Sequence, residues 1–337
     1  MRLTEFDYEL PDERIAQHPI EPRDAARLLV DQGSHAPLHQ HVADLGEFLR
    51  DGDVLVVNDT KVIPARLRLT RSTGGAAEVL LLEPLDEQRR TWEAMVRPAK
   101  KMQPNEELFA NGQPLVRVVR RSEAGDTMII ELVGEGDPLS LLAAHGEMPL
   151  PPYITARLEQ PDRYQTVYAN RPASSAAPTA GLHLTPQLMA SFAARGIEIA
   201  RVELVVGLDT FKPVSANDPR DHQIHSERYC VPPEVMHACS AARRVVAVGT
   251  TSVRALESTA TFGVSEGRTQ LFIHRPYEWK VVDVLMTNFH MPRTTLLMMI
   301  DAFVGPRWRT LYEEALREEY RFLSFGDAML LDRNLTQ

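Results

Sequence analysis

The side chains best suited to move a proton in this chain are three histidines and one glutamate. His183 lies in residues 178–184, where a bend, a hydroxyl, a glycine and an imidazole could together bind the edge of a ligand. His222, His225 and Glu227 follow within one short stretch. Because an imidazole changes its charge near neutral pH, these residues predict general acid or base chemistry. A structural loop whose histidine bonds to the backbone is the alternative for residues 178–184.

A metal site is a second interpretation of the later stretch, because the spacing of His222 and His225 can ligate zinc when a further ligand converges. The stretch is short and follows proline and turn residues, so it does not present both imidazoles on one helix face. We therefore favour proton transfer or polar ligand contacts and expect no metal. The two cysteines, Cys230 and Cys239, lack CxxC spacing, which favours a reducing compartment and a cytoplasmic enzyme.

Residues 245–257 predict a strand, a turn and a helix start. The valine-rich run 245–248 is typical of a buried parallel strand, and Gly249 permits a sharp turn after it. One of the hydroxyls at 250–252 could cap the helix. The N–H groups of such a helix start attract an anion or a polar ligand edge, and Arg254 could add charge there. An ordinary strand-to-helix turn is the alternative.

Three other polar loops follow expected strands, at residues 58–61, 207–211 and 287–292. In open α/β sheets, ligands sit at the carboxyl ends of the strands, so these loops are expected to share one rim with Gly249. Within the second loop, Asp209 could accept hydrogen bonds from ribose hydroxyls. A turn carboxylate is the alternative for Asp209.

Alternating strands and helices over most of the chain predict an α/β main domain with a mostly parallel sheet. Strands are expected at 27–30, 54–57, 197–206, 245–248, 269–274 and 280–289. Helices are expected at 44–49, 138–145, 185–196, 232–244, 294–305 and 306–320, besides the one after Gly249.

The sequence pattern changes near residue 66, where short strands of alternating apolar and polar residues begin. They are expected at 65–70, 77–83, 91–97, 115–120 and 127–133, with turn signals such as Asn111-Gly112 between them. This spacing predicts a small antiparallel β-barrel inserted into the main domain. The expected division is 1–65 with 149–337 for the α/β domain and 66–148 for the barrel.

The 337 residues, 44% hydrophobic and 25% charged, are ample for a globular core. No apolar run reaches the ~18 residues of a membrane helix, and the acidic, mixed N-terminus is not expected to be a signal peptide. A net charge of −9 argues against a protein that coats nucleic acid non-specifically. Basic clusters nevertheless fall in or beside the barrel: Arg66, Arg68, Arg71, Arg97, Lys100, Lys101, Arg117, Arg120 and Arg121. They make the barrel the expected polyanion surface, with solvated strand faces as the alternative.

No Walker loop, GxGxxG, GxSxG or DFG-type set occurs, which argues against kinases, nicotinamide-dependent dehydrogenases and α/β-hydrolases. Taken together, several long motifs in one order resemble the S-adenosylmethionine:tRNA ribosyltransferase-isomerase family of queuosine biosynthesis. The motifs are residues 58–67, 146–154, 164–168, 177–183, 222 with 225–227, 248–254, 287–292, 320–322 and 326–329. The chain departs from the family pattern His-Val-Gly-x-Gly-Thr-Phe, because Val205 and Asp209 replace its histidine and second glycine. A role of that histidine cannot be carried over to Val205.

The resemblance implies an α/β domain with an inserted β-barrel. It implies transfer and isomerisation of the ribosyl part of S-adenosylmethionine, with no permanently bound cofactor and no metal. The acceptor would be the aminomethyl group of 7-aminomethyl-7-deazaguanine (preQ1) at the wobble position of tRNA with a GUN anticodon. The products would be epoxyqueuosine-tRNA, adenine and methionine. A cytoplasmic monomer without a membrane or a stable protein partner is expected.

The resemblance and the residue chemistry together predict three groups of site residues. Proton transfer is expected from His183, His222, His225 or Glu227. Cosubstrate binding is expected from Thr179, Gly181, Asp209, Thr210, Phe211, Gly249, Thr250, Thr251, Ser252 and Arg254. Arg254 is expected to pair with a carboxylate of the cosubstrate. Contacts with RNA or its base are expected from Asn58, Thr60, Arg66, Asn288 and His290.

Three other functions remain open at this point. An RNA-binding protein that uses the β-domain alone would bind RNA but release no adenine. A metal-dependent hydrolase using His222 and His225 would hold zinc and lose activity with a chelator. A methyltransferase would release S-adenosylhomocysteine, although the chain lacks a glycine-rich nucleotide loop after its first strand.

Overall fold

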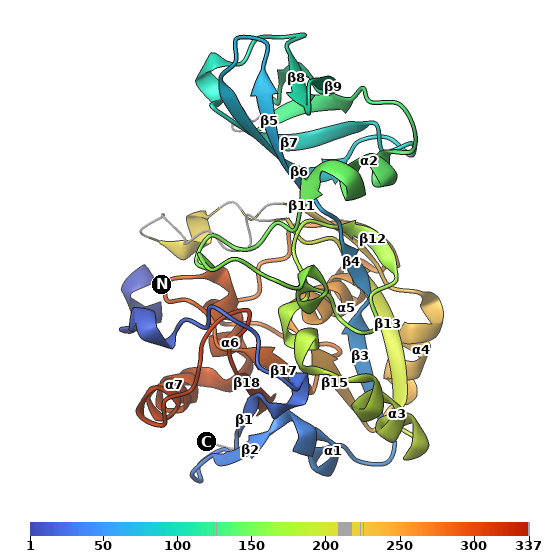
Figure 1. Ribbon diagram of the computed structural model, residues 1–337. Coiled ribbons are helices and arrows are strands. Elements are labelled where there is room, and N and C mark those ends of the chain that lie inside the picture. Colours follow the sequence, from blue (N-terminus) through green and yellow to red (C-terminus); the bar gives the residue numbers. More distant parts are fainter. Residues whose placement is uncertain (124, 126, 208–217, 223, 225, 336–337) are drawn as a thin grey trace. The chain divides into compact units, whose positions relative to one another are not determined.

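The computed structural model describes residues 1–123, 125, 127–207, 218–222, 224 and 226–335. The chain forms two compact units, which Figure 1 shows in sequence colours. The larger unit contains Met1–Thr60, Pro152–Asn170 and Pro178–Gln337, and the smaller contains Lys61–Pro151 and Arg171–Ala177.

The segment Arg171–Ala177 lies in the smaller unit, whereas the division expected from the sequence placed it in the main domain. Its strand β12 (Arg171–Ser174) pairs with β4 (Thr60–Val62) in a two-stranded sheet. The backbone N–H of Ile63 also donates to the Ser174 carbonyl, at 3.0 Å. A four-residue strand that contains a proline shows little apolar alternation, so only its long-range pairing reveals it.

The larger unit is built on a nine-stranded sheet. In spatial order its strands are β16 (Glu266–Thr269), β14 (Glu227–Cys230), β13 (Glu198–Leu204), β3 (Asp53–Asn58), β15 (Arg244–Val248), β17 (Val284–Asn288), β18 (Ala328–Asp332), β1 (Arg27–Val30) and β2 (Leu38–His41). The central strands β13, β3, β15 and β17 are parallel, as is the pair β18–β1. The other pairings are antiparallel, so the sheet is mixed and the expected parallel order holds at its centre. Apolar runs do not encode the direction of a neighbouring strand.

Both faces of the central strands are buried, which explains their continuous apolar character. In β3, Leu55 and Val57 share a core with Leu188 and Phe192 of helix α3 (Pro186–Ala194). Their alternating neighbours Val54 and Val56 are equally buried, and helix α5 (Thr250–Phe262) packs against β13, β3 and β15.

The remaining helices are short and surround this sheet. The α-helices are α1 (Leu45–Phe48), α4 (Pro233–Ala241), α6 (Thr295–Val304) and α7 (Trp308–Arg317). The 3₁₀ turns are η1 (Leu3–Phe6), η2 (Asp12–Arg14), η3 (Arg23–Ala25), η4 (Val42–Asp44), η6 (Pro161–Tyr164), η7 (Thr179–His183), η9 (Pro219–Asp221) and η10 (Gly305–Arg307). Within the described ranges, no helix combines the length and apolar character needed to cross a membrane.

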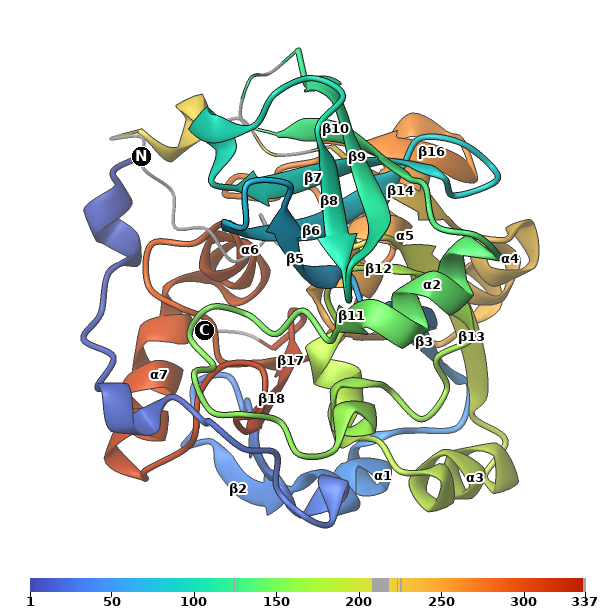
Figure 2. The ribbon, with the colours of Figure 1, turned by 45° about the horizontal axis from the view of Figure 1, so that its top comes forward.

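The smaller unit is a closed antiparallel barrel, visible in Figure 2. Its order is β5 (Arg66–Arg71), β6 (Ala76–Pro84), β7 (Thr91–Arg97), β10 (Met128–Leu132), β9 (Gln113–Arg121) and β8 (Glu107–Ala110), and β8 returns to β5. Strand β11 (Gly146–Glu147) adds to β5, and the unit also contains α2 (Pro138–His145) and η5 (Ala99–Lys101). In β7, Trp92, Ala94 and Val96 are buried while the alternate residues are more exposed, as the period of two predicts.

Several strands differ from the expectations, and the sequence pattern did not predict β2, β14 or β18 of the large sheet. The strand expected over 269–274 ends at Thr269, whose hydroxyl oxygen accepts the backbone N–H of Leu271 at 3.0 Å. Strand β8 was not expected, although the turn signal Asn111-Gly112 closes the β8–β9 hairpin with positive φ at both residues. A two-residue Asn-Gly turn requires strands on both sides, so this turn was the signal that could have found β8.

A buried carboxylate anchors helix α5 to the segment before β17. Glu257 is fully buried and accepts the backbone N–H groups of Lys280, Val281 and Val282 at 3.0–3.1 Å. It also accepts the Tyr277 hydroxyl at 3.1 Å. These donors compensate the cost of burying the carboxylate.

Glu257→Gln should lower the free energy of unfolding by about 2–3 kcal/mol, because the amide would place an NH2 donor against N–H donors. Urea denaturation would measure the change. Glu266→Gln, at an exposed position of β16, is the control and should change the stability by less than about 0.5 kcal/mol. A similar small change for Glu257→Gln would contradict the anchoring role.

Candidate active site

Polar segments follow the carboxyl ends of β3, β15 and β17, the parallel centre of the larger sheet. At the end of β15, Gly249 has φ 86° and ψ 151°, and its N–H donates to the Met286 carbonyl of β17 at 2.8 Å. This positive φ lets the chain turn sharply from β15 into α5. The structure therefore forms the expected strand, turn and helix.

Helix α5 does not have the expected hydroxyl cap, because its N-cap residue is Gly249, which makes no side-chain cap hydrogen bond. Ser252 instead donates its hydroxyl to the Val248 carbonyl at 2.8 Å. The Thr251 hydroxyl oxygen is buried without a hydrogen-bond partner among the described residues. Helix starts without a cap keep N–H groups available to another acceptor, so this turn can bind an anion or a polar ligand edge.

The turn η7 lies directly beside Gly249. A Cβ atom added to Gly249 would lie 3.6 Å from the Cβ of Ala180, at ordinary contact distance. On the other side of η7, the Thr179 hydroxyl donates to the Asn288 side-chain oxygen at 2.8 Å. The Asn288 amide nitrogen lies 3.1 Å from His183 Nε2. The structure thus brings together the loops after β15 and β17 and residues 179–183.

His183 is buried and neutral. Burial, reinforced by the positive charges of Arg321 and Arg23, lowers the pKa of His183 to about 3. Since the Asn288 NH2 group is a donor, we assign Nε2 as the acceptor and place the ring proton on Nδ1. The ring also bonds to the backbone of Arg23. His183 lines a small pocket with Pro19, Ile20, Arg23, Arg163, Leu182, Ser324 and Phe325.

Glu227 and Arg254 form a buried ion pair between β14 and α5. Arg254 also donates to the Thr269 carbonyl at 3.5 Å, while its Nε has no partner among the described residues. The ion pair connects the start of β14, where the stretch with His222 and His225 ends, to helix α5 after the Gly249 turn. The guanidinium expected to bind a ligand carboxylate is thus held by a carboxylate of the protein.

Several expected site residues lie elsewhere or outside the described part of the chain. Asp209, Thr210, Phe211 and His225 are outside the described residues. His222 is half-buried directly after η9, and its N–H donates to the Pro219 carbonyl at 3.0 Å. In the ranges that the structure describes, no three His, Cys, Asp or Glu side chains come close enough to hold a metal.

Of the residues expected to contact RNA, two are buried and a third lies in the smaller unit. Asn58 is fully buried, donates to the Leu204 carbonyl at 3.0 Å and accepts the N–H of Thr60 at 3.2 Å. It therefore joins the ends of β3 and β13. Thr60 is also fully buried. Arg66 lies on β5 of the smaller unit and donates to the Leu150 carbonyl at 3.3 Å.

His290 follows the end of β17 but bonds away from the His183 network. Its Nε2 lies 3.1 Å from the Thr287 hydroxyl, and its N–H donates to the Tyr312 hydroxyl at 2.9 Å. Its carbonyl accepts the hydroxyl of Tyr8. Burial lowers the pKa of His290 to about 3, so this imidazole is neutral as well.

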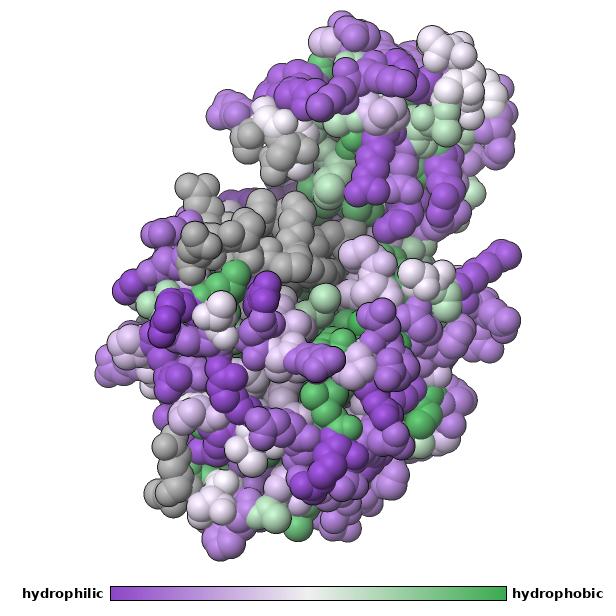
Figure 3. Space-filling view, turned by 90° about the vertical axis from the view of Figure 1, so that its left-hand side faces the viewer, coloured by the Kyte–Doolittle hydropathy of each residue, from purple (hydrophilic) through white to green (hydrophobic). Residues whose placement is uncertain are grey.

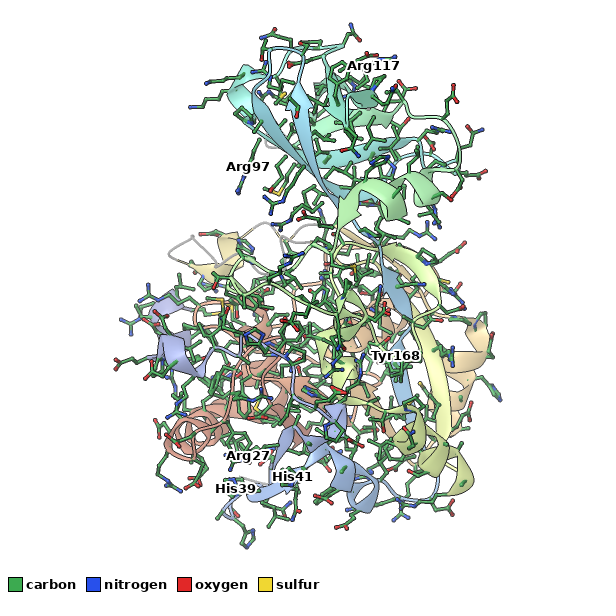
Figure 4. All side chains as sticks on the ribbon, viewed as in Figure 1. Arg27, His39, His41, Arg97, Arg117 and Tyr168 are labelled. Carbon is green, nitrogen blue, oxygen red and sulfur yellow. The ribbon has the colours of Figure 1, made fainter. Side chains whose placement is uncertain are left out.

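Sequence reasoning assigned no role to Thr166 and Tyr168, which the structure places against η7. A Cβ atom added to Gly181 would lie 1.9 Å from the Tyr168 hydroxyl and 3.0 Å from Cγ2 of Thr166. Figure 4 shows Tyr168 inside the larger unit. Neither hydroxyl has a hydrogen-bond partner among the described residues, and burial raises the pKa of Tyr168. The protonated Tyr168 hydroxyl is therefore an unused donor beside the site, which sequence spacing alone does not reveal.

Comparison with known proteins agrees with the motifs. A family model for queuosine biosynthesis proteins matches residues 3–331. The chain belongs to the queuosine biosynthesis protein family. This assignment confirms the resemblance inferred from the ordered motifs.

Relatives in this family are named S-adenosylmethionine:tRNA ribosyltransferase-isomerases, which are transferase and isomerase enzymes. The one from Symbiobacterium thermophilum is 51% identical and covers 98% of this chain and 100% of its own length. The one from Thermus thermophilus is 49% identical, with 98% and 99% covered. A crystal structure of an S-adenosylmethionine tRNA ribosyltransferase from Thermotoga maritima matches with a TM-score of 0.55 and 37% identity, covering 97% of this chain and 99% of that one.

Gly181→Ala should lower the free energy of unfolding by about 2 kcal/mol, because the new methyl group would overlap the Tyr168 hydroxyl. Adding Tyr168→Phe should restore part of the loss, since it removes the overlapped atom. Urea denaturation of the single and double variants would measure this coupling. Gly75→Ala, where the nearest atom lies at 3.7 Å, is the control. Strictly additive effects would show that the contact is absent.

The free energy of unfolding should fall as the pH drops below 6.5. The unfolded state binds protons on His183 and His290 from about pH 6.5, whereas the folded state resists until about pH 3. Each histidine should therefore cost about 1 kcal/mol per pH unit below 6.5. Urea denaturation from pH 7 to 5 should give a shallower pH slope for His290→Asn than for the natural sequence. Equal slopes would contradict the assignment of His290.

Proposed function

We propose that this chain transfers and isomerises the ribosyl part of S-adenosylmethionine onto the aminomethyl group of preQ1 in tRNA. The observation that carries the proposal is the near full-length similarity to relatives named S-adenosylmethionine:tRNA ribosyltransferase-isomerase. The acceptor is a tRNA with a GUN anticodon carrying preQ1 at the wobble position. The enzyme acts in the cytoplasm as a monomer, with S-adenosylmethionine as a cosubstrate and no permanent cofactor or metal.

The proposed chemistry begins at the ribose carbon beside the sulfonium. The sulfonium acidifies the C5′ protons, so a positioned base removes one of them. Opening of the ribose ring then expels adenine. The aminomethyl group of preQ1 attacks the opened sugar, and closure of the epoxide expels methionine. The products are adenine, methionine and epoxyqueuosine-tRNA.

His183 is the proton-transfer group that the described contacts support best. Asn288 and the Arg23 backbone fix its ring orientation. The pKa of about 3 makes the resting imidazole a weak base, so the proposal requires substrate binding to raise this pKa toward neutrality. The lone pair of Nε2 currently faces the Asn288 amide, so proton transfer requires that hydrogen bond to open. His222, His225 and Glu227 stay in the proposal as further candidates.

The cosubstrate is proposed to bind at the start of α5. The first-turn N–H groups of Thr250 to Ser252 and the unpaired Thr251 hydroxyl offer polar contacts to it. The Tyr168 hydroxyl adds a buried donor beside Gly181 of η7. Arg254 is proposed to bind the methionine carboxylate, which then competes with Glu227 for the same guanidinium. Release of Glu227 would leave a carboxylate free for proton transfer.

The function is tested by incubating the protein with labelled S-adenosylmethionine and a preQ1-containing anticodon stem-loop. Adenine, methionine and a modified RNA are expected. S-adenosylhomocysteine would instead indicate a methyltransferase, and RNA binding without adenine release would indicate a binding protein. Loss of turnover with a chelator would indicate a metal-dependent hydrolase.

His183→Gln should lower kcat for adenine release by about 100-fold or more, because it removes the basic nitrogen while keeping a side-chain acceptor for Asn288. The affinity for S-adenosylmethionine, measured by calorimetry, should change little. A kcat within about threefold of the natural enzyme would exclude His183 as the base. A parallel loss of affinity and kcat would assign it to cosubstrate binding.

A further inference from the structure

Apart from Arg66, Arg89 and Arg90, which are half-buried and have no ion pair among the described residues, two classes of arginine and lysine can be distinguished on the six-stranded barrel. The first class is held in ion pairs by glutamates of the same unit: Arg68 with Glu147 at 2.9 Å, Arg71 with Glu106 at 2.6 Å, and Arg117 with Glu131 at 3.0 Å and Glu107 at 3.1 Å. The second class is exposed and forms no ion pair with any described residue: Arg97, Lys100, Lys101, Arg120 and Arg121. We refer to this second class as the cationic rim.

The topology places the cationic rim at one end of the barrel. Strand β10 lies between β7 and β9 and is antiparallel to both, so β7 and β9 run in the same direction. Arg97 is the last residue of β7, and Arg121 is the last residue of β9. Arg121 donates to the Ala99 carbonyl at 3.2 Å, which holds the turn with the two lysines against the end of β9.

The charges of the rim are not neutralised within the described barrel. Arg120 and Arg121 bond only to backbone carbonyls, those of Arg121, Gly125 and Ala99. Carbonyl oxygens satisfy N–H groups but leave the positive charge in place. The whole chain carries a net charge of −9, so an unpaired cluster of five cations is a local exception to its composition.

The chemistry of the rim favours phosphate over a protein partner. Arginine forks and lysine point charges both bind phosphate oxygens, and clustered cations release counterions from nucleic acid. Protein interfaces depend instead on buried apolar and aromatic anchors. The rim offers no exposed large apolar side chain, and the face of the smaller unit in Figure 3 is mostly hydrophilic.

We propose that the cationic rim binds the phosphate backbone of the tRNA, and that the ion-paired arginines of the barrel do not. This inference rests on the proposed function, because it takes tRNA as the substrate. It narrows the sequence expectation, which took all the basic clusters of the barrel together as one polyanion surface. In Figure 4, Arg97 and Arg117, one from each class, lie at different parts of the barrel.

Two double variants of the full chain test the proposal. Arg97→Gln/Arg120→Gln removes two rim charges, and Arg68→Gln/Arg117→Gln removes two ion-paired charges from the same barrel. Both change the net charge equally, and Arg117 and Arg120 lie on the same strand. Circular dichroism and thermal melting would verify that both fold.

The readout is the Kd for preQ1-containing tRNA at several salt concentrations. The rim variant should bind about tenfold more weakly at low salt, and its slope of log Kd against log salt should fall by about 1.5, the value for two lost phosphate contacts. The control variant should match the natural sequence. With saturating tRNA, kcat and the KM for S-adenosylmethionine should be unchanged in both.

An equal loss of tRNA affinity in both variants would overturn the proposal and assign the effect to net charge. Unchanged affinity in both would exclude the cationic rim as a tRNA contact. These results leave the proposed function intact if the natural protein still releases adenine. If the natural protein neither binds this tRNA nor releases adenine, the proposed function and the inference both fail.

Discussion

The close approach of η7 to the β15–α5 turn is the constraint on which the polar site of the larger unit depends. Gly181 leaves room for the Tyr168 hydroxyl, and Gly249 turns the chain next to Ala180. With the backbones this close, Asn288 at the end of β17 can bond to Thr179 and to His183 at once. A side chain at either glycine would strain or fill the space where these loops meet.

Burial determines the chemistry that this site can perform. Burial and the nearby arginines hold His183 neutral and lower its affinity for a proton, so it does not supply a resident positive charge. Glu227 and Arg254 form an ion pair in a protein interior that disfavours either charge by itself. A ligand carboxylate would have to replace Glu227 at Arg254. Binding of the cosubstrate would then release Glu227 from its ion pair.

The two units carry different electrostatic roles. In the larger unit, the polar groups around His183 are buried and bonded to one another, which suits a reaction that must exclude water. In the smaller unit, a rim of cations is exposed and forms no ion pair with a described residue, while Arg68, Arg71 and Arg117 are held in ion pairs. Long-range attraction needs accessible charge, whereas proton transfer needs fixed orientation, so under the proposed function the two requirements would be met by different parts of the chain.

The sequence by itself determined the family and many of the elements, although β2, β8, β12, β14 and β18 were not predicted. Valine runs specified the buried strands β3 and β15, alternation specified the barrel strands, and ordered motifs specified the queuosine biosynthesis family, because these signals are local or are read directly along the chain. Only the tertiary structure decided which side chains meet. Asn58 joins β3 to β13, Arg254 pairs with Glu227, and the Tyr168 hydroxyl faces Gly181 with no hydrogen-bond partner among the described residues. The physical reason is that hydrogen bonds and ion pairs between distant segments depend on strand order and side-chain direction, which a pattern of residue types does not encode.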